Sequence, residues 1–282
     1  MKTKNLLFLI TILSLIQING FAQIKMPQAS PSSKVVQQMG LTEVHLDYSR
    51  PSKKGRKIFG ELVPFGQVWR TGANNPTTLE FDTDIKVNGQ NLPAGKYAFY
   101  TIPDKKQWTV IFSKKTELWG AMGYDANDDA LRVSVPVNKL KKPVESMSIQ
   151  FADLTDTGAT LQLAWDKSQI ELRMETEVDP VVMKQIRELL IDQDSDNPGL
   201  YFQAANYYFT NDKDLNTALE WVNKAVDADP KYYIVHLKAK IQAALGMKSE
   251  AIATAQQSLE LAREANNPDY VGLNERLIAS LK

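Results

Sequence analysis

The segment from Arg50 to Arg70 concentrates positive charge, since Glu61 is its only acid among several lysines and arginines. The planar guanidinium of arginine matches the oxygens of a carboxylate or a phosphate. The glycines of the segment allow a ligand to approach the backbone closely. This pattern predicts an anion or polar-ligand site, and the residues assigned to it are Arg50, Lys54, Arg56, Trp69, Arg70 and Asn74.

The same segment also fits a purely structural role. Arg50 and Arg70 would then pair with acids such as Asp47 and Glu80, and Trp69 would pack into a core. The segment is long for a connection between strands, and long ordered loops often carry function. Both interpretations stay open, together with a hydrolase of a polar or anionic substrate that uses the loop Arg50–Asn74.

Other patterns offer weaker chemistry. Glu80, Asp82 and Asp84 face one way on a predicted strand, which is more typical of a solvated face than of a catalytic carboxylate pair. The chain has two histidines, His45 and His236, and no cysteine, and it contains neither an HExxH zinc motif nor a GxSxG elbow. We therefore expect no metal and no cofactor, assign no catalytic residue, and favour a binding role over an enzymatic one.

The N-terminus has the three parts of a secretory signal peptide. Lys2 and Lys4 precede an apolar run that is too short to span a membrane, and small residues stand before a cut after Ala22. We expect residues 1–22 to be removed and the protein to be exported to the periplasm or the extracellular space, with no transmembrane span. Residues 23–34, rich in Pro, Ser and Gln, are predicted to form an extended leader.

Composition narrows the class of partner. The chain has 33 basic and 33 acidic residues, which give a formal net charge of zero. Broad binding to nucleic acid needs a cationic face that displaces counterions. We therefore expect no nucleic-acid partner.

Short runs with period-two alternation extend through residues 35–178. Val44, Leu46 and Tyr48, for example, share one face of a predicted strand, and Asn88-Gly89 supplies a turn. Many short strands with few helical segments between them predict an antiparallel β-sandwich or a jelly-roll-like domain.

Several spaced motifs in this part of the chain agree in order with those of a known family. They are Tyr48-Ser49-Arg50-Pro51, Val63-Pro64-Phe65-Gly66, Trp69-Arg70-Thr71-Gly72-Ala73-Asn74, Leu92-Pro93-Ala94-Gly95-Lys96-Tyr97 and Trp108. Over about residues 30–178 the sequence resembles the secreted bacterial family called domain of unknown function 2911. The resemblance implies a β-rich exported domain, sometimes followed by helical repeats, and it implies no activity.

The pattern changes to a helical period at Asp179-Pro180. We predict a linking helix within residues 179–197 and helical hairpins over residues 198–282, the last helix acting as a cap. The whole chain is thus expected to be a multidomain α and β protein.

Small residues recur at a fixed spacing in the helical part. Ala205 and Ala239 are 34 residues apart, and Ala218 and Ala251 are 33 apart. Small side chains at these places let the two helices of a hairpin approach closely. Over about residues 198–265 the sequence resembles tetratricopeptide repeats, although Ser258 stands where Ala is usual, and the resemblance implies interaction with a protein or peptide.

One face of the first helix in each hairpin is expected to line a groove for that partner. The residues assigned to this groove are Phe202, Asn206, Phe209, His236 and Lys240. The sequence thus predicts an exported cell-envelope binding or scaffolding protein. Its repeats would recruit a protein partner, and its β domain would have an undefined role or bind a polar or anionic small ligand.

Overall fold

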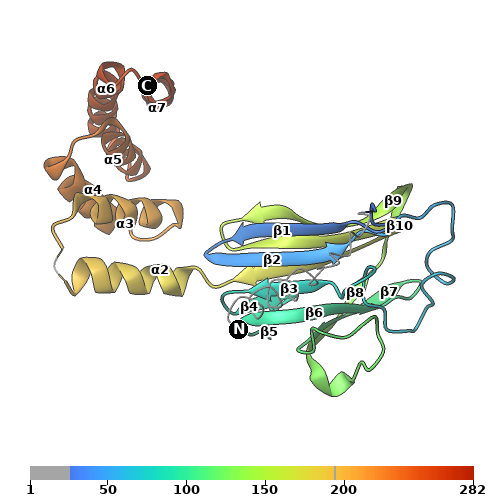
Figure 1. Cartoon of the computed structure of the whole chain (residues 1–282). Helices are drawn as coiled ribbons and strands as arrows, with labels where there is room; N and C mark the ends of the chain where they lie inside the picture. The colour runs from blue at the N-terminus through green and yellow to red at the C-terminus, as the bar shows by residue number, and fades with distance from the viewer. Residues whose placement is uncertain (1–25, 194) are drawn as a thin grey trace, which may run out of the picture. The chain divides into compact units, whose positions relative to one another are not determined.

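The computed structural model describes residues 26–193 and 195–282, and the predicted signal peptide lies outside them. The chain divides into two compact units, Met1–Thr176 and Glu177–Lys282. Antiparallel sheets form the described part of the first unit, and six α-helices form that of the second (Figure 1). The expectation of a β-rich part followed by a helical part is confirmed. Among the described residues no helix has the length and apolar character needed to cross a membrane.

Six strands of the first unit form one antiparallel sheet in the order β1-β2-β3-β6-β7-β8. Their bounds are β1 Ser32–Met39, β2 Thr42–Ser49, β3 Thr78–Phe81, β6 Gly95–Ile102, β7 Gln107–Ser113 and β8 Asp129–Pro136. Strands β1 and β2 pair along their whole length, from Ser32 opposite Ser49 to Met39 opposite Thr42. The last residues of the predicted leader therefore belong to the sheet.

The other four strands form a second antiparallel sheet in the order β5-β4-β10-β9. Their bounds are β4 Ile85–Val87, β5 Gln90–Leu92, β9 Asn138–Thr155 and β10 Gly158–Thr176. The two long strands β9 and β10 form a hairpin, and their pairing is interrupted by register shifts on both sides of Asp166. Such shifts bend a strand and increase its twist.

The chain crosses between the two sheets in residues 82–84, which separate β3 from β4. Both acids of this connection bind backbone. The carboxylate of Asp82 accepts a hydrogen bond from the N–H of Glu43 at 2.9 Å, and that of Asp84 accepts one from the N–H of Ala94 at 2.8 Å. The acids that alternate in the sequence thus hold the crossover in place.

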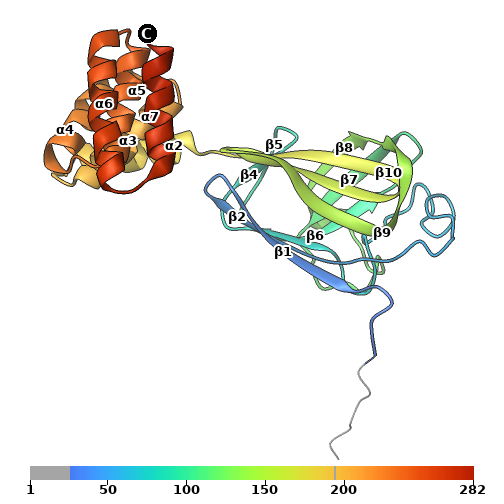
Figure 2. The ribbon, with the colours of Figure 1, turned by 90° about the horizontal axis from the view of Figure 1, so that it is seen from above.

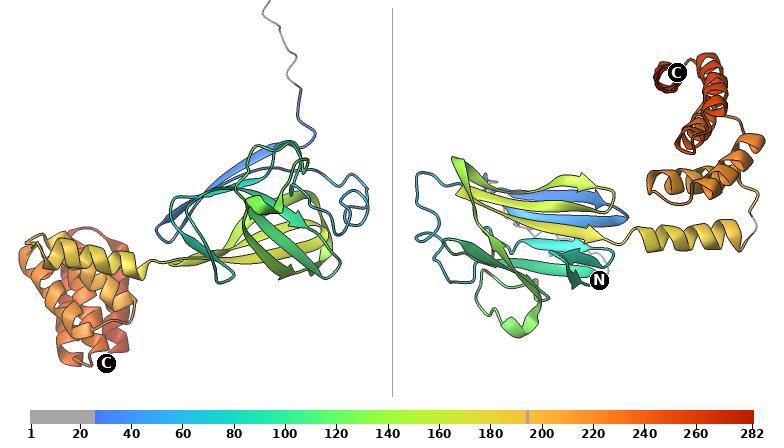
Figure 3. Two further views of the ribbon diagram at one scale, coloured as in Figure 1. Left: turned by 90° about the horizontal axis from the view of Figure 1, so that it is seen from below. Right: turned by 180° about the vertical axis from the view of Figure 1, so that it is seen from behind.

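The inward residues of both sheets share one hydrophobic core, and the strands curve around it in Figure 3. A cluster of rings packs in this core. The indoles of Trp69 and Trp165 are stacked with centroids 5.8 Å apart, and Phe59 meets Trp108 edge-on at 4.7 Å. Edge-to-face and offset-stacked pairs are the preferred arrangements of aromatic rings.

Buried Tyr48 connects the two sheets directly. Its hydroxyl donates to the carbonyl of Ile149 at 3.0 Å and accepts from the N–H of the same residue at 3.1 Å. Tyr48 belongs to β2 and Ile149 to β9, so the hydrogen bonds join strands of different sheets. The Tyr48 hydroxyl thus provides hydrogen bonds to the buried N–H and carbonyl groups of Ile149.

The second unit is a series of helices that pack against their neighbours in chain order, as seen in Figure 2. Their bounds are α2 Asp179–Ile186, α3 Pro198–Thr210, α4 Leu215–Ala228, α5 Tyr232–Ala244, α6 Lys248–Glu264 and α7 Pro268–Ser280, and a π-helical turn, Arg187–Ile191, continues α2. Side chains cap three of the helices. Asn197, Asp214 and Asn267 accept hydrogen bonds from backbone N–H groups of the first turns of α3, α4 and α7.

The recurring alanines of the sequence lie in the helix contacts. Ala205, Ala218, Ala239 and Ala251 are all fully buried. Ser258, which departs from the repeat pattern, is buried as well. Its hydroxyl donates to the carbonyl of Tyr232 at 2.7 Å and accepts from the side-chain amide of Asn274 at 2.8 Å, so the polar residue joins α5, α6 and α7.

Candidate functional site

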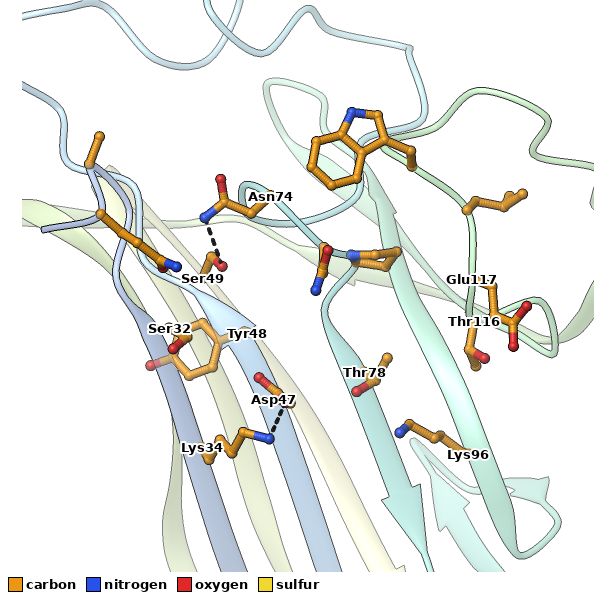
Figure 4. Close-up of a pocket in the computed structure, with 16 residues that line it drawn as sticks. Ser32, Lys34, Asp47, Tyr48, Ser49, Asn74, Thr78, Lys96, Thr116 and Glu117 are labelled. Carbon is orange, nitrogen blue, oxygen red and sulfur yellow. Dashed lines mark hydrogen bonds and ion pairs between the residues drawn. The ribbon is translucent and has the colours of Figure 1, made fainter. Parts of the chain in front are cut away.

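A groove of about 970 Å³ runs over the outer face of the six-stranded sheet (Figure 4). Strands β1, β2, β3 and β6 form its floor, and residues 116–119 of the loop between β7 and β8 contribute to its wall. The side chains that line it include Lys34, Asp47, Asn74, Thr78, Lys96 and Trp119. We call this feature the outer-face groove.

Strand register brings the floor residues together. Lys34 is directly opposite Asp47, and Asp47 is directly opposite Thr78. Their chain neighbours Leu46 and Leu79 are buried in the core. Because successive side chains on a strand point to opposite faces, the polar row must face outward, as Figure 4 shows.

The charges on the floor are arranged as exposed ion pairs. Lys34 Nζ lies 2.9 Å from the carboxylate of Asp47, and their side chains are 79% and 47% exposed. Lys96 Nζ lies 3.9 Å from Oε2 of Glu80. Exposed pairs of this kind contribute little to stability, so their charges are available to exchange partners with a ligand.

Asn74 forms the end of the groove near the start of β1. Its backbone is in the left-handed region with φ of 57°, which asparagine tolerates better than most residues. The side-chain amide donates to the carbonyl of Ser30 at 3.1 Å and to the hydroxyl of Ser49 at 3.4 Å. The amide oxygen of Asn74 is an acceptor group at the same end of the groove.

Trp119 gives the groove an apolar wall. It lies in the loop between β7 and β8, and 63% of it is exposed. A ring with one polar N–H and two apolar faces suits a ligand that has both kinds of surface. The outer-face groove thus combines charges, amides and hydroxyls with one aromatic platform.

The structure separates the residues that the sequence assigned to the cationic segment. Asn74 alone among them lines the outer-face groove. Arg50 Nε donates to the carbonyl of Met147 at 3.0 Å, and Arg56 donates to the carbonyls of Lys53 and Ser52 at 2.9 and 2.5 Å. These two arginines fasten the loop to neighbouring backbone.

Lys54 and Trp69 have backbone and core roles. The N–H of Lys54, which has φ of 49°, donates to the carboxylate of Glu145 at 2.8 Å. Trp69 packs against the core rings, and its indole N–H donates to the carbonyl of Gly72 at 3.3 Å. Arg50, Lys54, Arg56 and Trp69 therefore have the structural role that the sequence also allowed. The acids named in it have other partners, since Asp47 pairs with Lys34.

Arg70 differs from the other arginines of the segment. Its Nε is buried and has no hydrogen-bond partner within residues 26–193 and 195–282. A Cβ placed on Gly120 would lie 3.2 Å from its Nη1, so the guanidinium lies under the loop between β7 and β8.

The candidate residues of the helical unit lie on α3 and α5. Asn206 is exposed, and Phe202 meets the ring of Tyr233 edge-on at 5.3 Å. Lys240 Nζ lies over the ring of Phe209, 4.7 Å from its centroid, a distance typical of a cation–π contact. Phe202, Asn206 and Phe209, spaced four and three residues apart, share one side of α3, and Lys240 of α5 lies against its end at Phe209.

His236, which the sequence analysis assigned to the partner groove, is buried. It is 8% exposed, and its Nδ1 lies 2.8 Å from Oδ1 of Asn274 on α7. Burial lowers the pKa of His236 below its ordinary value, the hydrogen bond to Asn274 opposes this effect, and the charge of Lys240 adds to it. The imidazole therefore joins the last helix to the array and does not line a surface.

The sequence reasoning missed Lys34, Lys96 and Trp119. The local signal for Lys34 was weak, because Val35 and Val36 are both apolar and Val36, which shares the face of Lys34, is 60% exposed. Lys34, Lys96 and Trp119 lie near Asp47 and Asn74 because of the strand register and the path of the loop between β7 and β8. Neither can be predicted from the local sequence pattern.

The family is shown by a match over residues 30–174, to the family described as Protein of unknown function (DUF2911). No curated protein and no solved structure matches the chain. The matched range is more than half of the 282 residues, contains the motifs from Tyr48 to Trp108, and ends before the helical unit. The chain belongs to the DUF2911 family.

Proposed function

We propose that the chain is an exported, non-enzymatic binding protein of the cell envelope, with the β unit holding a polar ligand in the outer-face groove. The observation that carries this proposal is the groove itself, with its paired charges, amides and exposed Trp119. Binding sites typically place a few polar groups beside apolar and aromatic walls. In this proposal the two sheets form the sandwich that the sequence predicts.

The hydrolase alternative is less well supported by the groove. Asp47 is held by Lys34, and the acids Asp82 and Asp84 bind backbone N–H groups at the crossover between the sheets. A carboxylate that serves as a general acid must give a proton to its substrate, whereas these carboxylates are engaged with an ammonium group or with backbone N–H groups.

The test compares two exposed residues of one loop. Trp119 lines the outer-face groove, whereas Met122, which is 74% exposed, does not. The melting temperature of the purified chain is measured against panels of sugars, small anions and short peptides. We expect a ligand to raise it, by mass action, in the unchanged chain and in Met122→Ala, and to raise it less in Trp119→Ala.

Both variants should melt at the same temperature without ligand, because exposed side chains contribute little to stability. A ligand response that is equal in Trp119→Ala and Met122→Ala would contradict the assignment of the groove. No response of the unchanged chain to any panel would contradict ligand binding by the β unit.

A second role, protein recruitment by the helical unit, is favoured by the face formed by Phe202, Asn206, Phe209 and Lys240. The buried alanines between the helices support the tetratricopeptide interpretation. An amide and an ammonium beside aromatic rings suit the carboxylate end of a peptide. We therefore expect Asn206→Arg to weaken binding of peptides with a free C-terminus, measured by fluorescence anisotropy, while Ala253→Arg on an exposed position of α6 does not.

A further inference from the structure

Arg70 and Tyr100 lie directly opposite each other on the outer face of the six-stranded sheet. Trp69 and Thr101 form an antiparallel bridge with backbone hydrogen bonds of 2.8 and 2.9 Å. The residues next to a bridged pair face each other on the other side of the sheet. Since Trp69 packs in the core, Arg70 and Tyr100 point away from it.

Two polar atoms of this pair have no partner. Arg70 Nε and the hydroxyl oxygen of Tyr100 are buried and make no hydrogen bond in the part of the chain that the structure describes. Tyr100 is 0% exposed. Buried polar groups of folded proteins are almost always hydrogen-bonded, so each of these two groups is a candidate for binding a ligand.

Both groups are donors. Arginine keeps its charge at every physiological pH. Burial raises the pKa of Tyr100 above its ordinary value, so the hydroxyl keeps its proton and can donate it to an acceptor. The matching ligand carries negative charge and accepts at least two hydrogen bonds. A carboxylate does both, and its two oxygens fit the edge of a guanidinium.

The loop between β7 and β8, residues 114–128, covers the pair. Gly120 lies against Arg70, as described above, and its φ of 70° is one that glycine adopts readily. The ring of Tyr124 meets that of Tyr100 edge-on with centroids 5.4 Å apart. The loop thus lies over the pair, with Tyr100 fully buried and Arg70 partly buried.

The acid next to this loop is already neutralised. Asp129 accepts a hydrogen bond from Arg132 at 2.5 Å and one from the hydroxyl of Tyr124 at 2.7 Å. Burial and the bond to Asp129 together raise the pKa of Tyr124 to about 12, against the opposing effect of Arg132. Asp129 Oδ2 therefore has its own cation, whereas the buried Oδ1 has no hydrogen-bond partner among the described residues. No ion pair within the described residues joins Asp129 to Arg70.

We propose that Arg70 and Tyr100 form a binding site for a carboxylate or similar small oxyanion beneath residues 114–128. Neither residue lines the outer-face groove, so the site does not depend on the function proposed for the groove. A water molecule would satisfy the two donors but not the charge of Arg70. The site therefore prefers an oxyanion over water.

The test measures the melting temperature of the purified chain with acetate, formate, sulfate or phosphate, against chloride at equal ionic strength. We expect at least one oxyanion to raise it in a saturable way. Tyr100→Phe removes one donor and should weaken the apparent affinity about tenfold, the effect of one hydrogen bond to a charged group. Arg70→Gln, which removes the charge, should abolish the response, and Arg132→Gln should keep it.

The unchanged chain decides the proposal even where a variant fails to fold. No saturable response to any of the four oxyanions overturns it. An equal response in Arg70→Gln overturns it as well, because the anion then binds elsewhere. A crystal structure grown with acetate that shows only water at Arg70 and Tyr100 would also overturn the proposal. None of these outcomes affects the test of the outer-face groove, which compares ligand binding by Trp119→Ala and Met122→Ala.

Discussion

The β unit and the helical unit differ in the side chains that lie at their closest internal contacts. In the first, Phe59, Trp69, Trp108 and Trp165 meet in the core. In the second, fully buried alanines stand where helices touch, as at Ala218. The rings come from distant parts of the chain and fill the space between two sheets. The alanines recur at repeat spacing and let adjacent helices approach closely. The difference shows that the β unit depends on large side chains that are distant in sequence, whereas the helical unit depends on small side chains at regularly spaced positions.

The largest expected effect tests the ring cluster. Trp165→Ala leaves a cavity beside Trp69, and substitutions of this kind cost about 3–5 kcal/mol of unfolding free energy. We expect the loss in the transition of the β unit, followed in urea by near-ultraviolet circular dichroism. Trp119→Ala, which removes an exposed indole, should change that transition by less than about 0.5 kcal/mol. Equal losses in both variants would contradict the role given to the cluster.

The opposite change tests the helical unit. Ala218→Leu adds volume where α3 and α4 pack, and overpacking costs about 1–3 kcal/mol. The same substitution at Ala253, which is exposed on α6, is the matched control and should be nearly neutral. Far-ultraviolet circular dichroism in urea reports the helices. If both leucine variants unfold alike, close helix contact at Ala218 is not what limits the packing.

The smallest expected effect concerns pH. Because burial lowers the pKa of His236 in the folded chain, the unfolded chain binds the proton more tightly. Stability is therefore fully present above the ordinary histidine pKa of about 6.5 and falls as the pH drops below it. The slope is at most about 1.4 kcal/mol per pH unit for one proton.

Urea midpoints measured between pH 5 and pH 8 check this prediction. His236→Gln should reduce the dependence in the transition of the helical unit, whereas His45→Gln, at an exposed position, should leave it unchanged. A steeper acid loss in His236→Gln would show that other groups control it.

Much of the architecture follows from local patterns, and the site does not. The alternation of Val44, Leu46 and Tyr48 and the helical period after Asp179 lead to antiparallel sheets and then helices, because each pattern reflects one element and its buried face. The family follows from motifs that keep their order. The sandwich and the tetratricopeptide identity stay predictions, and so do the export and the partners.

The groove could not be read from the sequence because it depends on pairing between distant strands. Lys34 meets Asp47 within a hairpin, but Thr78 and Lys96 join them only through the register of β3 and β6. Arg50 and Arg70 look alike in sequence. Arg50 Nε donates to the carbonyl of Met147, nearly a hundred residues away, whereas Nε of Arg70 has no partner among the residues that the structure describes. Their difference is a property of the tertiary structure.

The crossings between the sheets have a consequence for how the β unit folds. Residues 82–84 join β3 of one sheet to β4 of the other, and Val137 alone joins β8 to β9. A segment of one to three residues keeps the end of a strand in one sheet next to the start of a strand in the other, so assembly of either sheet brings part of the other into place. We therefore expect the two sheets to form together, and pairings such as β4 with β10, which join residues far apart in sequence, to make folding of the β unit slow compared with the closing of helical hairpins.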